Sequence, residues 1–269
     1  MQFEDYWRRQ LGSVLLDGFE VSPREKLTRE LLHQSLHIDM RRPVLRNKMR
    51  KLDYRFMAAE AFWILSGDNR VETISPFNAR IHEFSDDGTT FYGAYGPKIM
   101  DQLPYVLEKL KNDGLSRQAV LTIWRECPPQ TKDVPCTVAI SFTLRNGLLD
   151  VHVFMRSSDL WLGLPYDVFN FCMLGHYVCA KLNNPTGEVC EAVAEPGTLH
   201  LTAVSSHLYE INWGAAAMCL NERPHLQRPT AEYMYQDAEG LMATLETLRT
   251  TKPGDLVRWW EANDASVER

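Results

Sequence analysis

One stretch, residues 135–182, decides the fold of this chain: PCTVAISFTLRNGLLDVHVFMRSSDLWLGLPYDVFNFCMLGHYVCAKL. Two apolar, strand-like runs cover residues 137–144 and 148–155, and Arg145-Asn146-Gly147 separates them. An Asn-Gly pair between two apolar runs is a strong hairpin signal. Residues 168–182 are apolar on nearly every side, which is typical of a helix in the core. The stretch therefore predicts a β-hairpin followed by a core helix.

The rest of the chain mixes helical and strand-like patterns. Helices are predicted at 54–65, 100–110, 211–220, 231–247 and around Trp259-Trp260-Glu261, and strands at 119–124 and 199–204. Because regular βαβ alternation is missing, we expect an α+β fold with one substantial sheet. The sequence has no internal repeat and no Gly/Ser- or Pro-rich linker, so we expect a single domain over residues 1–269.

The composition is that of an ordinary globular protein, with 45% hydrophobic and 24% charged residues. The net charge of -6 argues against a general nucleic-acid-binding surface, but a few arginines in one pocket can still bind a small anion. No apolar run approaches the ~20 residues that span a bilayer. The first residues are acidic, unlike a signal peptide. We therefore expect no membrane partner and a cytoplasmic location, or the host cytoplasm if the chain is viral.

Six cysteines occur, and none forms a C-x-x-C pair. Their spacing argues against a disulfide framework and against a zinc site, because no paired Cys/His ligands appear. Most are expected to be small buried apolar residues. Cys136 differs, since it follows a proline at the start of a predicted strand, where a nucleophile is a reasonable alternative to a core residue.

Several short motifs follow one another in a fixed order, each weak by itself. They are Glu60-Ala61-Phe62-Trp63-Ile64-Leu65-Ser66-Gly67-Asp68-Asn69, Tyr95-Gly96, Ser116-Arg117, Pro135-Cys136, Arg156-Ser157-x-Asp159, Leu162-Gly163-Leu164-Pro165 and His207-Leu208-Tyr209. In this order they resemble the thymidylate synthase family, and within it the deoxycytidylate (dCMP) and cytidylate (CMP) 5-hydroxymethylases. The similarity runs from about Arg24 to about Asn212.

The resemblance implies a single thymidylate-synthase-like α+β domain, with a mixed sheet that forms a dimerising face and helices around it. It also implies a homodimer in which Arg117 serves the phosphate site of the neighbouring subunit. The second arginine of that family motif is Gln118 here, so phosphate binding could be weaker.

The chemistry that the resemblance implies begins with the Cys136 thiolate, which adds to carbon 6 of a pyrimidine nucleotide and makes carbon 5 nucleophilic. Carbon 5 then takes a one-carbon unit from 5,10-methylenetetrahydrofolate, and no metal is involved. Arg156 would lower the pKa of the thiol by its positive charge. Glu60 would act as general acid/base, with Tyr95 beside it in the catalytic set.

The same resemblance assigns the binding residues. Arg24, Arg117, Arg156 and Ser157 would hold the 5'-phosphate, where the planar fork of arginine suits phosphate oxygens. His207 and Tyr209 would bind the sugar 3'-hydroxyl. The folate would contact Glu60, Asp159, Leu162, Gly163 and Tyr166, with Asp159 binding the pterin.

One departure concerns the base. The family's uracil-reading asparagine is replaced by Asp167. A carboxyl group that keeps or shares a proton can donate to the ring nitrogen of cytosine and accept from its amino group. In an ionised carboxylate, an acceptor oxygen would face the acceptor ring nitrogen without a proton between them. Asp167 therefore favours a cytosine nucleotide; the alternative is that Asp167 only caps the following helix.

Other departures concern the product. The family's active-site tryptophan falls on His82 by an ungapped count from Glu60, unless the alignment slips, and the final residues 262–269 lack an apolar tail that would close over folate. Both changes favour capture of the methylene intermediate by water, which gives a hydroxymethyl group and leaves tetrahydrofolate unoxidised. Thr137 and Met155 also differ from the family pattern without an evident reason.

We therefore expect a dCMP 5-hydroxymethyltransferase. The alternatives are a CMP 5-hydroxymethylase, a dCMP or dUMP methylase of the thymidylate synthase type, and an inactive nucleotide-binding regulator. The intact set of Cys136, Arg156 and Glu60 argues against the inactive regulator.

Overall fold

A computed structural model describes residues 3–47, 49–183, 194–221 and 237–251. Its centre is a six-stranded sheet in the order β1-β2-β6-β5-β4-β3. The strands are β1 (Phe19–Val21), β2 (Thr28–Asp39), β3 (Val120–Thr122), β4 (Thr137–Arg145), β5 (Leu148–Asp159) and β6 (Glu195–Tyr209). Neighbouring strands run antiparallel except β5 and β6, which are parallel, so the sheet is mixed.

The predicted hairpin joins β4 to β5. Arg145 and Leu148 are paired across it, and the two residues between them have positive φ angles, 53° at Asn146 and 77° at Gly147. Two successive positive φ angles are what a type I′ turn requires, and its twist matches that of the flanking strands. The Asn-Gly pair therefore sets the register of the central hairpin.

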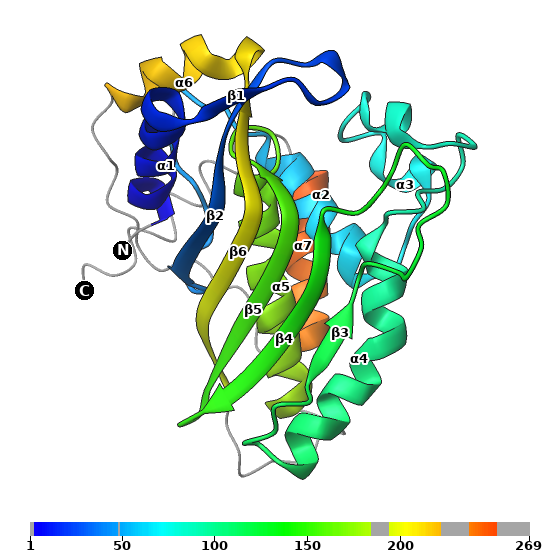
Figure 1. The fold of residues 1–269 in the computed structure, drawn as a ribbon. Coiled ribbons are helices and arrows are strands. Elements are labelled where there is room, and N and C mark those ends of the chain that lie inside the picture. The colour runs from blue at the N-terminus through cyan, green and yellow to red at the C-terminus, as the bar shows by residue number, and fades with distance from the viewer. Residues whose placement is uncertain (1–2, 48, 184–193, 222–236, 252–269) are drawn as a thin grey trace.

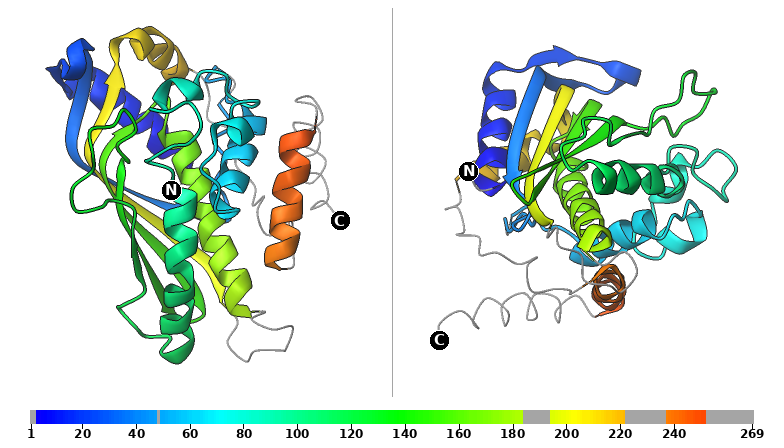
Figure 2. Two further views of the ribbon diagram at one scale, coloured as in Figure 1. Left: turned by 90° about the vertical axis from the view of Figure 1, so that its right-hand side faces the viewer. Right: turned by 90° about the horizontal axis from the view of Figure 1, so that it is seen from below.

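Helices cover one face of the sheet in successive layers (Figure 2). The core helix α5 (Leu164–Asn183) lies directly on β5 and β6, α2 (Tyr54–Leu65) packs on α5, and α7 (Ala238–Thr250) packs on α2. The longer α4 (Tyr95–Asn112) lies beside β3, while α1 (Phe3–Asp17) and α6 (Trp213–Leu220) pack together at the β2 side. Short helical turns complete the described chain: η1 (Pro23–Glu25), α3 (Val71–Ile74), η2 (Ile81–Phe84) and η3 (Glu210–Asn212).

The opposite face of the sheet, which we call the open face, carries no helix in the described part of the chain and faces the viewer in Figure 1. Residues alternate along β5, so that Val151 and Val153 are buried under α5 whereas Phe154 is 43% exposed. Leu148 and Val204 are likewise exposed on neighbouring strands. The open face is therefore partly apolar.

The α+β class with one mixed sheet is confirmed. The predicted helix at 54–65 has the bounds of α2, and its start is fixed by Asp53, whose carboxylate accepts hydrogen bonds from the backbone N–H groups of Arg55 and Phe56. Strand β2 and helix α1 were not predicted. Residues 231–236 and 259–261 of the predicted C-terminal helices lie outside the described residues. None of the described helices is both long and apolar enough to cross a membrane.

Candidate active site

The parallel pair β5–β6 brings polar side chains together at the C-terminal ends of these two strands. In its register Ser157 lies opposite Ser205 and Asp159 opposite His207. The Ser157 Oγ lies 3.3 Å from His207 Nδ1, within hydrogen-bond reach. The His207 ring meets the Tyr209 ring edge to face, with 5.2 Å between centroids. The motifs around residues 156–159 and 207–209 therefore meet in space, as the sequence predicts.

Arg24 joins this group from η1. Its Nη2 donates a hydrogen bond to the Tyr209 hydroxyl at 3.5 Å. Arg24 and Glu25 both have positive φ, 54° and 61°, a conformation that side chains other than glycine adopt at a cost. The guanidinium is exposed at the sheet edge beside the His207–Tyr209 pair, where an anion could reach it.

Cys136 lies immediately before β4 and is half-buried. Arg156 folds back over the same segment: its Nε donates to the carbonyl of Pro135 at 3.0 Å and its Nη2 to that of Val134 at 2.9 Å. Burial raises the pKa of the Cys136 thiol, while the charge of Arg156 acts in the opposite direction. The expected lowering by Arg156 is therefore present, but in this state burial outweighs it. Cys172, Cys179 and Cys219 are buried, as expected of core cysteines.

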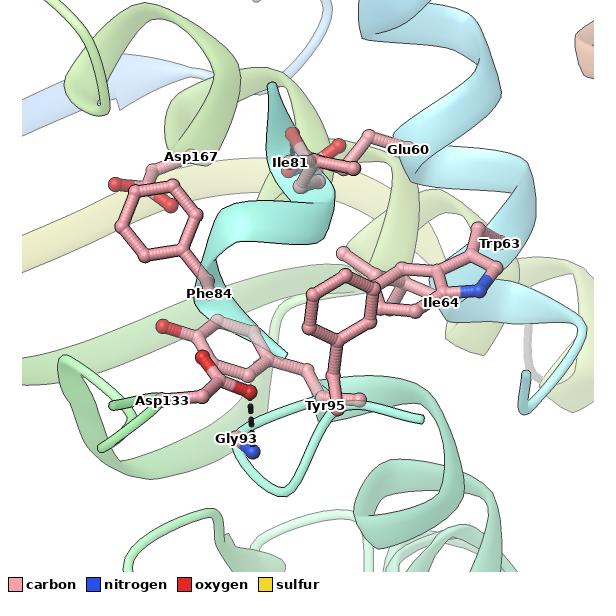
Figure 3. Close-up of a pocket in the computed structure, with 12 residues that line it drawn as sticks. Glu60, Trp63, Ile64, Ile81, Phe84, Gly93, Tyr95, Asp133 and Asp167 are labelled. Atoms are coloured by element: carbon pink, nitrogen blue, oxygen red, sulfur yellow. Dashed lines mark hydrogen bonds between the residues drawn. The ribbon is translucent and has the colours of Figure 1, made fainter. Parts of the chain in front are cut away.

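A cavity of about 170 Å³ opens beside these residues (Figure 3). It is lined by Glu60, Trp63, Ile64, Ile81, Phe84, Phe91, Gly93, Ala94, Tyr95, Asp133, Asp167 and Asn170. Three predicted site residues, Glu60, Tyr95 and Asp167, therefore share one pocket.

Glu60 and Asp167 bring two carboxyl groups from α2 and α5 into this pocket. Asn170 Nδ2 donates to Glu60 Oε2 at 2.8 Å. Burial raises the pKa of Glu60 to about 7, and the Asn170 hydrogen bond opposes the shift. Burial also raises the pKa of Asp167 well above its usual value, and the negative charges of Glu60 and Asp159 add to this. Both groups therefore hold their protons more strongly than carboxyl groups in water.

The alternative reading of Asp167 as a helix cap does not match its place in the chain. Helix α5 begins at Leu164, and the Asp167 backbone N–H already donates to the Gly163 carbonyl at 3.0 Å. Asp167 thus lies within the first turn of the helix, not at the residue before it.

Tyr95 connects the pocket to the segment that contains Cys136. Its hydroxyl oxygen accepts hydrogen bonds from the Thr137 backbone N–H at 3.2 Å and from Thr137 Oγ1 at 3.0 Å. Its ring stacks on that of Phe171 with 6.3 Å between centroids. These contacts give Thr137 a role that the sequence did not reveal, because they fix the residue after Cys136 against the pocket wall.

Asp133 is a pocket residue that the sequence reasoning missed. Its Oδ2 accepts a hydrogen bond from the Gly93 backbone N–H at 2.6 Å, drawn as a dashed line in Figure 3. A Cβ at Gly93 would come within 2.5 Å of the Asp133 carbonyl oxygen, so this approach needs glycine. Burial raises the pKa of Asp133. In the sequence, Asp133 could have been identified as a candidate site residue by its position three residues before Cys136.

Other predicted residues lie outside the pocket. His82 is exposed on η2 with its Nδ1 against the Ala79 carbonyl, whereas its neighbours Ile81 and Phe84 line the cavity. Leu162 is exposed, and Gly163 belongs to the turn before α5.

Asp159 and Tyr166 are held by their own neighbourhood. Asp159 Oδ1 accepts from the backbone N–H groups of Trp161 and Leu162 at 2.8 and 2.9 Å. The Tyr166 hydroxyl accepts from the Asp53 N–H at 3.2 Å. Burial raises the pKa of Asp159 and lowers that of the nearby His207, and the attraction between the two groups opposes both shifts.

Arg117 lies far from Cys136 within one chain. It precedes β3, and Arg145 at the end of β4 donates hydrogen bonds to the carbonyls of Gly114 and Leu115 nearby. Cys136 lies before the other end of β4, which has 9 residues. Strand β3 pairs Val120 with Ser141, so Arg117 lies level with about Leu144, and at roughly 3.3 Å per residue it is about 26 Å from Cys136 along the strand.

The mixed sheet, its layered helices and a cysteine beside a pocket with three carboxyl groups are the features expected of a thymidylate-synthase-like domain. Comparison with known families agrees: the family described as "Thymidylate synthase" matches residues 5–247. The chain belongs to the thymidylate synthase family, whose members bind nucleotide monophosphates and are homodimers.

Two curated relatives come from phages. A protein named "Deoxyuridylate hydroxymethyltransferase" from Bacillus phage SP01 is 32% identical over 232 residues, which covers 76% of this chain and 56% of that protein. One of the same name from Pseudomonas phage M6 is 33% identical over 165 residues, covering 58% of this chain and 44% of that protein. The chain thus spans about half the length of these relatives.

Proposed function

We propose that this chain is a folate-dependent dCMP 5-hydroxymethyltransferase. The overall reaction combines dCMP, 5,10-methylenetetrahydrofolate and water to give 5-hydroxymethyl-dCMP and tetrahydrofolate. The observation that carries the base preference is the raised pKa of Asp167 in the pocket. Burial and the negative charges of Glu60 and Asp159 favour the protonated form of Asp167. A protonated carboxyl group supplies the donor that the cytosine ring nitrogen needs, and its second oxygen accepts from the amino group.

The pocket offers unused hydrogen-bonding atoms, as a ligand site should. Trp63 Nε1 and Asn170 Oδ1 are buried without a hydrogen-bond partner among the described residues, and both side chains line the cavity. Buried polar groups are rarely left unpaired unless a ligand or water satisfies them. The flat rings of Trp63 and Phe84 and the apolar side chain of Ile81, which also line the cavity, suit the ring of a pterin.

In this proposal each described residue has a defined task. The Cys136 thiolate forms a bond to carbon 6, and the positive charges of Arg156 and Arg24 favour the thiolate. Glu60 moves protons at the base, for which a pKa near 7 is well suited. Ser157, His207 and Tyr209 hold the phosphate and sugar. The folate supplies a one-carbon unit at the oxidation level of formaldehyde, bound next to Glu60 and Asp159.

The proposed hydroxymethyl product is supported by the names of both phage relatives. It requires water to reach the methylene intermediate. Glu60 and Asp133 are the carboxyl groups on the pocket wall that could position such a water. The role of His82 in admitting water stays a prediction, and residues 262–269 lie outside the described part of the chain.

The second candidate is dUMP as substrate. Both relatives are named for deoxyuridylate, and a protonated carboxyl group carries one donor and one acceptor. Asp167 could present these in the order that uracil requires, accepting from the ring N–H and donating to the carbonyl. Base preference is therefore decided by measurement of both substrates.

We also propose a homodimer formed through the open face. The separation of about 26 Å between Arg117 and Cys136 along β4 supports a site that Arg117 completes from another subunit. The exposed Leu148, Phe154 and Val204 give the open face the apolar character of an interface.

One experiment tests the proposed function. The protein is incubated with methylenetetrahydrofolate and, separately, with dCMP, CMP, dUMP and UMP, and the products are weighed by mass spectrometry. We expect a gain of CH2O on dCMP without formation of dihydrofolate. A gain of CH2 with formation of dihydrofolate would make the protein a methylase. If no product forms and no tritium is released from carbon-5-labelled substrate, the result would support an inactive regulator.

A further inference from the structure

Three histidines form a row across the open face. His37 on β2 is paired with His200 on β6, and His200 is paired with His152 on β5, so one histidine stands on each of three adjacent strands at the same level. The His152 and His200 rings are stacked with 4.6 Å between centroids, and the His37 ring meets His200 at 4.8 Å. Asp150, two residues before His152, reaches the same place: its Oδ2 is 3.9 Å from His200 Nε2.

In each of these side chains, one nitrogen or oxygen atom is hydrogen-bonded to a neighbour, and the other is available to bind a ligand. His200 Nδ1 is 2.7 Å from His37 Nδ1, so one of the two nitrogens donates to the other. When His200 donates, its Nε2 carries the lone pair that faces Asp150. His152 Nε2 is hydrogen-bonded to Thr143 Oγ1 at 2.9 Å, which leaves its Nδ1.

The carboxylate follows the same pattern. Asp150 Oδ1 accepts from the Thr198 backbone N–H at 2.6 Å, which leaves Oδ2. Metal-binding histidines in proteins almost always have their second nitrogen held by such a partner, because the hydrogen bond fixes the tautomer and the ring orientation. The partners here are His37, Thr143 and the backbone of Thr198.

The ligand atoms converge. Asp150, His152 and His200 each offer one atom, and these atoms lie within 4.8 Å of one another. A tetrahedral zinc site with bonds of about 2.0–2.1 Å needs ligand atoms roughly 3.3 Å apart, so modest side-chain rotations close the site.

We propose that Asp150, His152 and His200 form a binding site for a divalent transition metal of the zinc class, with His37 and Thr143 orienting the two histidines. Two imidazoles and one carboxylate leave a fourth position open to water or to a group from another molecule.

This site is separate from the candidate active site. The pocket lies among α2, α4 and α5, whereas the histidine row lies on the open face. Along β5, His152 precedes Arg156 by four residues, or about 13 Å of strand. The ligands come from two strands that are distant in the sequence, so no linear spacing motif reveals them.

Titration of the chelator-treated protein with Co²⁺ and Zn²⁺ tests the proposal without any measurement of activity. The metals are added both to the assembled protein and during refolding, so that a second copy on the open face cannot hide the site. We expect one ion per chain, a visible Co²⁺ absorption band that Zn²⁺ abolishes, and a metal-dependent rise in Tm.

Matched variants make the test specific. His152→Gln and His200→Gln should each weaken binding by at least 100-fold, and Thr143→Val by about 10- to 100-fold, because it loses only an orienting hydrogen bond. His33→Asn, which changes an exposed histidine on β2 and tolerates its φ of 54°, should bind as the parent does. Thermal melts without metal show that each variant is folded. The proposal is overturned if the parent gives no Co²⁺ band and no metal-dependent Tm shift, or if both glutamine variants bind like the parent.

Discussion

The backbone N–H of Arg156 donates a hydrogen bond to the carbonyl oxygen of Cys136 across 2.9 Å. This contact joins β5 to the segment before β4, and the Arg156 guanidinium is held against the same segment by its hydrogen bonds to the carbonyls of Pro135 and Val134. Burial raises the pKa of Cys136, and the positive charge of Arg156 opposes that effect more strongly than that of Arg24, so Arg156 does the more to favour a thiolate.

Replacement of Cys136 by serine should abolish turnover and the release of tritium from carbon-5-labelled nucleotide, because an alcohol does not ionise in this environment. Cys127→Ser is the matched control, since Cys127 is exposed and outside the site. The assay is tritium release over time for both variants and the parent. Normal release by Cys136→Ser would show that another group is the nucleophile.

Replacement of Asp167 by asparagine should shift preference from dCMP towards dUMP, because an amide matches the donor and acceptor order of uracil. A buried polar group left unpaired costs ~1–3 kcal/mol, or roughly tenfold to a hundredfold in specificity. The measurement is the ratio of kcat/KM for the two nucleotides. An unchanged ratio would remove the main support for cytosine recognition.

The stability of the protein should depend on Glu60 in a defined pH window. Its pKa is about 7 in the folded chain and 4.5 in the unfolded one, so the folded state holds more protons between these values. Stability is therefore highest below pH 4.5, as far as this group is concerned, and falls as the pH rises to about 7.

Glu60→Gln removes that titration while keeping an acceptor for Asn170. Relative to the parent, the variant should gain at most about 3 kcal/mol on going from pH 5 to pH 8. Urea unfolding of both proteins at the two pH values measures the difference. Parallel pH profiles would mean that Glu60 titrates normally.

The proposed shared site can be tested by complementation. An Arg117→Ala chain and a Cys136→Ser chain are each expected to be inactive as homodimers. A heterodimer has one site that lacks both groups and one that contains both, so activity should return at one of its two sites. Purified heterodimers carrying two different affinity tags provide the measurement. Failure of such heterodimers to recover activity would place Arg117 outside the site.

The sequence predicted the elements whose pattern is local. Helix α2 has a capping aspartate and apolar spacing, and the β4–β5 turn has its Asn-Gly pair. Strand β2 was missed because its inward apolar residues, such as Leu36 and Ile38, lie only near its end, while much of the strand is polar. A strand at the side of an open sheet needs no continuous apolar run.

The functional ends of β5 and β6 were predicted too short for a related reason. Both strands continue beyond their apolar parts into polar stretches that include Ser157 and His207. These residues pair as strands but have the polar side chains of the proposed site, so the apolar pattern that predicts a strand is missing there. The motifs identified most of the group, whereas Asp133 and the histidine row depend on contacts between distant segments.

The parallel arrangement of β5 and β6 also affects the order in which the protein folds. The chain must leave Asp159, pass along the other layer as α5 and return at Glu195 before the two strands can pair. Contacts that require such a long closure form slowly, since the entropy of the intervening chain is lost before any pairing compensates for it. During synthesis Ser157 and Asp159 therefore emerge well before Ser205 and His207, their partners on β6. The Ser157–His207 contact can form only after β6 has paired with β5, so a fragment that ends before β6 lacks this contact.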